Sequence, residues 1–255
     1  MMRFASLGSG SEGNALVVEA GRTRVMLDCG FGLAESVYRL ERLGLQPGDI
    51  TAIVITHEHS DHIGGAARFS RKYRTPLWLT HGTLSWLVHD VRCELLHGID
   101  SHDTFAIQDI QVQPFPVPHD AREPAQFVFS DGVRRLGVLT DLGCSTPHVE
   151  ARLSGVDGLV LECNHDLDML MNSAYPASLK QRVAGRFGHL DNEAAAGLLA
   201  RIDQTRLQHV LAAHLSRQNN QPALARTALA AAMDCAEDWI GIADQSAGFD
   251  WRELA

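Results

Sequence analysis

The feature that most constrains this chain is a cluster of metal-binding side-chain types within six residues. The segment reads Thr56-His57-Glu58-His59-Ser60-Asp61-His62-Ile63-Gly64-Gly65 and follows the apolar run Ala52–Thr56. In an extended backbone His57 and His59 share a face, and the turn that follows brings Asp61 and His62 to a neighbouring point. Imidazoles with a carboxylate suit Zn²⁺ and, less selectively, Mn²⁺ or Fe²⁺. A solvated His-rich loop is the alternative, but the strand-to-helix context favours a site for two divalent ions.

Four ligands do not complete two metal sites, so further ligands are expected at strand ends downstream. His119 follows the run Val112–Val117, Asp141 follows Leu136–Thr140, and His214 follows Val210–Ala213. Side chains at such positions are delivered into a cleft at the edge of a sheet. Taken alone, an Asp there is often a turn or helix N-cap residue and a His an ordinary hydrogen-bonding residue. Together with the cluster at 57–62, all three are expected to be metal ligands.

Apolar runs alternate with segments of helical spacing along the whole chain, which predicts α/β layers with two sheets or half-sheets and helices outside. The predicted strands are Phe4–Leu7, Ala15–Glu19, Thr23–Asp28, Ala52–Thr56, Leu77–Thr80, Ile110–Phe115, Gln126–Phe129, Arg135–Thr140, Gly158–Cys163 and His209–Ala213. The predicted helices are Leu33–Leu43, Asp61–Tyr73, Leu84–Asp90, Asn192–Ile202 and Ala223–Ala236. Ser60-Asp61 and Asp191 occupy expected N-cap positions. No linker divides the chain, so residues 1–255 are expected to form a single domain.

Composition limits the class of protein and its surroundings. The 255 residues carry a net charge of −9, so the chain does not hold nucleic acid by bulk electrostatics, although bound cations would reverse the sign locally. Five cysteines form no C-x-x-C pair and are expected to be reduced. The N-terminus does not resemble a secretory signal and no run is long enough to span a membrane, so the expected location is the cytoplasm. The oligomeric state is left open.

The metal-ligand candidates together resemble the motifs of a known family. H-x-H-x-D-H at 57–62, followed in order by His119, Asp141 and His214, is similar to the metallo-β-lactamase fold. The resemblance implies an αββα sandwich with a dinuclear metal site at one edge of the two sheets. It implies that His57, His59 and His119 hold one metal, that Asp61, His62 and His214 hold the other, and that Asp141 bridges them. Zinc is the expected metal, with manganese or iron as alternatives.

The flanking motifs narrow the resemblance to one branch. Ser6–Asn14, Val117–Pro124, Leu161–Asp166, Gly188–Asn192 and His214–Pro222 resemble the YycJ (WalJ-type) branch, which is related to the RNase Z-type phosphodiesterases. Glu12 and Asp191 depart from it, since serine is more usual at both positions. His62 and Asp141 depart from the true lactamases. The chain also lacks a recognisable glyoxalase II-like terminal domain, and is too short for the β-CASP insertion.

The branch implies a phosphodiesterase or DNA exonuclease that uses a hydroxide bridging two metal ions. Asp61 is expected to help orient the nucleophile, while Asp28 and Asp120 are candidates for fixing the imidazole tautomers. Two other functions stay open. One is a small-molecule hydrolase acting on a cyclic phosphodiester or a thioester, and the other is a non-catalytic metal-containing protein that binds nucleic acid or regulates a partner.

Proton transfer and substrate binding are assigned to a second set of residues. By resemblance to RNase Z, His189 is the expected proton donor and Glu162 its orienting partner; the alternatives are a helix cap for His189 and a plain salt bridge for Glu162. His165 is open to phosphate binding, metal contact or a packing role. Asn14 and the glycine-rich loop Gly8–Gly13 are either phosphate contacts or an ordinary turn. The run Arg71-Lys72-Tyr73-Arg74 is either a nucleic-acid contact or a solvated helix face. Six histidines are expected to be structural or on the surface: His81, His89, His97, His102, His148 and His209.

Overall fold

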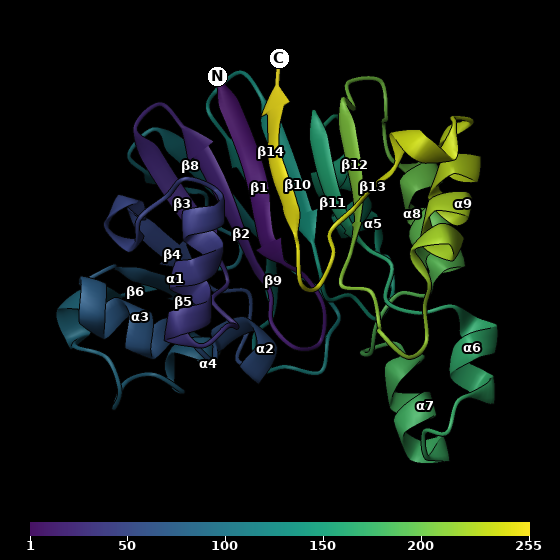
Figure 1. Ribbon diagram of the computed structural model, residues 1–255, viewed down its shortest axis with the longest axis horizontal. Coiled ribbons are helices and arrows are strands. Elements are labelled where there is room, and N and C mark those ends of the chain that lie inside the picture. The colour runs from purple at the N-terminus through teal and green to yellow at the C-terminus, as the bar shows by residue number, and fades with distance from the viewer.

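The computed structural model describes residues 1–255 and contains two seven-stranded sheets. The first has the order β14 (Phe249–Leu254), β1 (Met2–Gly8), β2 (Ala15–Ala20), β3 (Thr23–Leu27), β4 (Ala52–Val54), β5 (Leu77–Thr80) and β6 (Leu96–Ile99). The second has the order β13 (Gly241–Ile242), β12 (His209–Ala213), β11 (Gly158–Glu162), β10 (Arg135–Leu139), β9 (Ala125–Ser130), β8 (Ile110–Pro116) and β7 (Phe105–Ile107). The two sheets stand face to face, with the N- and C-terminal strands paired beside each other (Figure 1).

Helices cover the outer face of each sheet (Figure 1). Helices α1 (Leu33–Arg42), α3 (Ala66–Tyr73) and α4 (His81–Leu84) lie on the first sheet, and α5 (Pro147–Leu153), α8 (Asn192–Arg201) and α9 (Pro222–Met233) lie on the second. Three apolar cores hold these layers together: one between the sheets, which contains Phe4, Phe127 and Phe129, and one under each helical layer. The αββα sandwich expected from the sequence is confirmed.

Strand direction explains why ligand-type residues gather at one edge. Strands β3 to β6 run parallel to one another, and so do β10 to β13. Covered on both faces, such strands are almost continuously apolar, and β11 and β4 are buried along their whole length. Polar residues therefore come where the strands end, and their carboxyl ends share an edge.

The predicted helix Asp61–Tyr73 is divided, which corrects the sequence-based boundary. Its residues form α2 (Ser60–Ile63) and α3, separated by Gly64-Gly65. The Gly65 N–H donates to the carbonyl of Cys29 at 2.7 Å, and a Cβ at Gly65 would lie 1.9 Å from the carbonyl oxygen of Phe31. This close approach docks the segment on the chain after β3. Ser60 and Asp61 lie inside α2, whose N-cap is His59, so their N-cap assignment is wrong, whereas that of Asp191 is confirmed.

Other differences concern short or irregular elements. The predicted helix Leu84–Asp90 is wrong, because α4 ends at Leu84 and the following residues form turns, closed mostly by bonds between residues three apart. Strands β6, β7, β13 and β14, and helices α5, α6 (Leu167–Asn172) and α7 (Ala177–Val183), were not predicted. Three short 3₁₀ turns at Pro47–Asp49, Cys93–Leu95 and Glu237–Trp239 complete the elements. Among the helices, none has the length and apolar character needed to cross a bilayer.

Candidate metal centre

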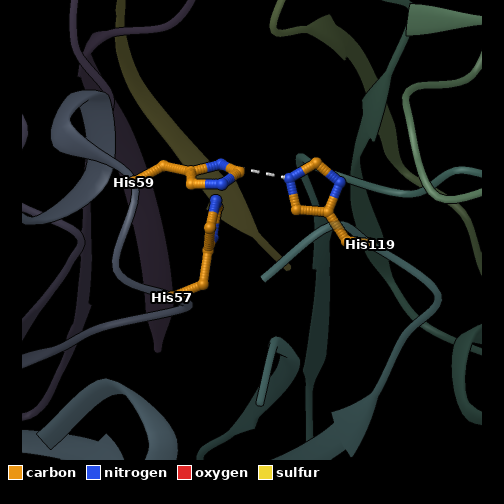
Figure 2. A group of neighbouring side chains, drawn as sticks. All are labelled: His57, His59 and His119. Carbon is orange, nitrogen blue, oxygen red and sulfur yellow. Dashed lines mark hydrogen bonds between the residues drawn. The ribbon is translucent and has the colours of Figure 1, made fainter. Parts of the chain in front are cut away.

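The first group of side chains comprises His57, His59 and His119, whose ring nitrogens lie within 4.8 Å of one another. Figure 2 shows the three rings converging from two separate loops, one after β4 and one after β8. His119 donates from Nδ1 to the Gly188 carbonyl at 2.9 Å, so in the neutral ring its Nε2 carries a lone pair. That Nε2 lies 3.3 Å from Nδ1 of His59. The Nε2 atom of His57 is buried without a hydrogen-bond partner.

The second group comprises Asp61, His62 and His214. His62 bonds Asp28 through Nδ1 at 2.7 Å, so its Nε2 faces the centre, 3.4 Å from Asp61 Oδ2. The Nε2 atom of His214 lies 3.3 Å from the same carboxylate oxygen. His214 adopts a left-handed backbone conformation (φ 55°) directly after β12, and its N–H donates to Ser9 Oγ at 2.9 Å.

Asp141 lies between the two groups. Its carboxylate is buried, with Oδ2 3.1 Å from Nε2 of His62 and Oδ1 3.7 Å from Nε2 of His119. Oδ1 is also 3.9 Å from Nε2 of His214. One carboxylate therefore reaches imidazoles of both groups, which is the geometry that a ligand shared by two ions requires.

Residues behind the imidazoles fix which nitrogen faces the centre. Asp28, itself in a left-handed conformation (φ 61°) after β3, accepts from His62 and from the N–H and hydroxyl of Thr56. Asp28 thus has the hydrogen bond expected of a residue that orients a ligand. Asp120 lies near two imidazoles without a hydrogen bond to either, so its orienting role stays a prediction. Its Oδ1 is 3.5 Å from Nε2 of His119 and 3.8 Å from Nε2 of His59, and its Oδ2 pairs with Arg182 at 2.5 Å. The Gly188 carbonyl orients His119.

The charges of the centre are strongly coupled. Burial raises the pKa of Asp141, but the imidazoles of His214 and His62 outweigh it and hold this pKa well below its usual range. Burial lowers the pKa of His214, yet Asp141 and Asp61 raise it to about 10. Burial lowers the pKa of His57 well below its usual value. Buried lone pairs and carboxylates that face one another fit divalent cations, which need deprotonated ligands.

His189 and Glu162 lie beside the carboxylate of Asp141. The Nδ1 atom of His189 bonds Glu162 Oε1 at 2.7 Å and lies 3.5 Å from Asp141 Oδ1. Glu162 is buried and also accepts the backbone N–H groups of Leu142 and Leu190, so both its oxygens are engaged. Burial lowers the pKa of His189, but Glu162 outweighs it and raises this pKa above its ordinary value. The helix-cap alternative for His189 is wrong, because Asp191 caps α8.

Among the remaining candidates, Asn14 and His165 are buried, whereas the Gly8–Gly13 loop reaches the pocket through Ser11. Asn14 bonds the backbone of Gly10 through both ends of its amide and lies 3.2 Å from Nε2 of His62. Gln245 ties down the Gly8–Gly13 loop by accepting from Glu12 N and donating to Gly13 O. His165 is buried, with Nδ1 3.3 Å from Asn164 Oδ1 and with Nε2 unpaired.

The other sequence candidates lie outside the metal-binding groups. The six histidines expected to be structural or on the surface belong to none of them. The run at 71–74 lies at the end of α3, where Arg71 bonds the backbone of Asp90 and Lys72 lies over the Tyr73 ring, so it is engaged with its own surroundings. Asn164 bonds both Nδ1 and the carbonyl of His214, a role that the Leu161–Asp166 motif around it does not by itself reveal.

A pocket of about 390 Å³ opens onto the centre. Its floor contains His59, Asp61, Asp141, His189 and His214. Its lining also includes the polar residues Ser11, Asn164, Ser216 and Asn219, and Tyr175, Leu179, Arg182 and Val183 from the segment that contains α7. The donors of the centre are therefore accessible to a ligand of moderate size.

Comparison with known proteins identifies the family of the chain. Residues 23–214 match the model of the beta-lactamase superfamily domain, and the chain belongs to this superfamily of metallo-β-lactamase fold proteins. Within it, the chain is 32% identical over 236 residues to exodeoxyribonuclease YycJ of Bacillus anthracis, covering 91% of this chain and 89% of that protein. It is 30% identical to exodeoxyribonuclease WalJ of Streptococcus pneumoniae, covering 94% and 91% of the two chains.

A solved structure supports the fold independently. Zn²⁺-bound PqqB from Methylobacterium extorquens superimposes with a TM-score of 0.78 over 99% of this chain and 100% of that one, at 17% identity. With the buried groups described above, the fold and the homologues define a metallo-hydrolase of this superfamily whose His/Asp clusters resemble a dinuclear metal site.

Proposed function

We propose that this protein is a DNA exonuclease with two zinc ions, manganese or iron being the alternatives. The observation that carries the proposal is the buried Asp141 carboxylate between two groups of imidazoles at the floor of an open pocket. Homology to two exodeoxyribonucleases over more than nine-tenths of the chain supports DNA as the substrate. A DNA substrate and five unpaired cysteines support the cytoplasm as its location.

In this proposal the ligands divide into two sets of three with one shared residue. His57, His59 and His119 hold one ion, Asp61, His62 and His214 hold the other, and Asp141 contacts both. Bound divalent ions supply a water nucleophile at neutral pH and neutralise charge on the phosphate. Asp61, which lines the pocket, orients the nucleophile toward the phosphorus.

The proposal gives His189 the task of protonating the leaving oxygen. Glu162 raises the pKa of His189 above its ordinary value, which favours the protonated ring, and the side chain lines the pocket. Glu162 holds Nδ1, so Nε2 is the atom that donates to the leaving group. Asn14 and His165 are proposed to position ligands. The Asn14 amide lies 3.4 Å from the Asp61 carbonyl oxygen, and His165 bonds Asn164, which in turn bonds His214.

The test is an assay of zinc-reconstituted protein on 5′- and 3′-labelled single- and double-stranded DNA, on RNA, and on bis(p-nitrophenyl) phosphate. We expect stepwise shortening of DNA from one end. Asp141→Ala protein, purified in the same way, controls for contaminating nuclease. Turnover of bis(p-nitrophenyl) phosphate alone would indicate a small-molecule hydrolase, and no turnover with any metal would indicate a non-catalytic protein.

A further inference from the structure

A short helical element covers one side of the candidate centre. Helices α6 and α7 follow β11 and project beyond the sheets, apart from the helical layers that cover them (Figure 1). Tyr175, between the two helices, and Leu179, Arg182 and Val183 on α7 form one wall of the pocket. The element therefore faces whatever ligand reaches the floor.

The apolar side chains of this wall have no role in the hydrophobic cores. No residue of α7 is buried, and neither Leu179 nor Val183 belongs to any of the three cores. Tyr175 is half-buried and is likewise absent from them. An aromatic ring and two aliphatic side chains that line a cavity without serving a core are typical of a wall that binds a flat, apolar group.

The charge of the element is opposite to that of the chain. Residues 167–183 contain Lys180 and Arg182 and one acidic residue, Asp168, although the net charge of the protein is −9. The Arg182 guanidinium is paired with Asp120 and also lines the pocket. The rest of the pocket lining includes polar groups of Ser11, Asn164, Ser216 and Asn219. A pocket lined by an aromatic ring, a guanidinium and polar groups suits a ligand that combines a base with phosphates.

We propose that the 167–183 element binds the terminal nucleotide of a DNA strand, with its base against Tyr175 and Leu179 and the strand phosphates beside Arg182. This inference rests on the proposed function and names the part of the substrate that the pocket recognises. A volume of about 390 Å³ is in the range of pockets for small molecules, and one nucleotide is of that size class. Recognition by stacking tolerates any base, as shortening a strand of arbitrary sequence requires.

The test removes either the Tyr175 ring from the protein or the terminal base from the DNA strand. The zinc-loaded protein is given two DNA strands that differ only in whether the terminal residue carries a base or is abasic. We expect Tyr175→Ala to lower kcat/KM on the ordinary strand by roughly ten- to hundredfold, and to lower it far less on the abasic strand. Tyr175→Phe retains the ring and should retain the preference for the base. Tyr38→Ala is the matched control, since Tyr38 is 65% exposed on α1 and outside the pocket.

Equal losses on both strands, or no loss, would overturn the inference while leaving the nuclease proposal intact. If the wild-type protein does not shorten DNA, the proposed function fails and the inference is tested by binding alone. Fluorescence anisotropy of labelled strands with and without the terminal base then gives the readout. A base-dependent affinity that Tyr175→Ala abolishes supports the wall as a nucleotide site, and affinities independent of both base and ring contradict it.

Discussion

At the scale of single residues, the hydrogen-bond partner of each imidazole decides which nitrogen faces the centre. His62 is held by the Asp28 carboxylate and His119 by the Gly188 carbonyl, so both present Nε2. These partners lie at strand ends or in loops far in the sequence from the histidines they bond. The partner of His119 is a backbone carbonyl, a group that every residue type has. The sequence therefore indicates Asp28 as a residue that orients an imidazole, but it carries no signal for Gly188.

Proton donation by His189 is tested by changing the leaving group. His189→Ala should keep both metals yet lose roughly 10²–10⁴ in rate on a poor leaving group such as a deoxynucleoside. With p-nitrophenolate, which departs without protonation, the same variant should lose much less. Glu162→Gln should show the same pattern more weakly, because it disturbs orientation without removing the acid. Uniform losses on both leaving groups would make His189 a phosphate-binding residue, and loss of metal would make it structural.

The raised pKa of His214 predicts how the metal-free protein responds to pH. Its folded value of about 10 exceeds the unfolded value of about 6.5, so its stabilising effect is complete below pH 6.5 and is lost as the pH rises through 10. Urea unfolding of EDTA-treated protein should show a falling free energy of unfolding between pH 7 and 10.

His214→Asn removes this imidazole and its effect on the neighbouring carboxylates. Asparagine tolerates the left-handed conformation at this position, and every other titrating group is shared with the wild type. The variant should show a smaller fall in the same pH range. An equal fall in both proteins would show that His214 is not the source.

At the scale of elements, the strands were predicted well because burial on both faces makes them nearly continuous apolar runs. Leu77–Thr80 and His209–Ala213 match β5 and β12 at both ends. The short edge strands β7 and β13, of three and two residues, carry too little pattern to be seen. The metal-binding motif was placed correctly between a strand and a helix, but the division of that helix depends on contacts with Cys29 and Phe31, which no local pattern reveals.

The joint between α2 and α3 is tested by adding one methyl group. Gly65→Ala places a Cβ against the carbonyl of Phe31, so we expect a loss of about 1–3 kcal/mol in the free energy of unfolding. Because the same contact docks the segment that carries Asp61 and His62, zinc affinity should also fall. Gly48→Ala is the control, since a Cβ there meets nothing within 4 Å and its φ is not positive. A Gly65→Ala protein as stable as Gly48→Ala would contradict the assigned contact.

At the scale of the whole molecule, the two sheets bring ligands from distant parts of the chain to one edge. The order of His57, His119, Asp141 and His214 along the sequence was informative because each follows a strand whose carboxyl end lies at that edge. The α6–α7 wall could not be predicted in this way, since its two short helices contribute little to the core and leave a weak hydrophobic pattern.

We further propose that residues 1–255 unfold as one domain, because the core between the sheets draws on both halves of the chain. Differential scanning calorimetry should show a single transition, both with zinc and after its removal, with the metal-loaded transition at the higher temperature. Two transitions that separate when the metal is removed would contradict this expectation.

The central claim is that two ions share Asp141, and metal counting tests it most directly. Elemental analysis of zinc-reconstituted wild-type protein after removal of free metal should give close to two ions per chain. Asp141→Ala, checked for folding by circular dichroism, should lose metal and activity together, because it removes a ligand that both ions share. One ion per chain in the wild type, or full occupancy and rate in Asp141→Ala, would contradict the shared site.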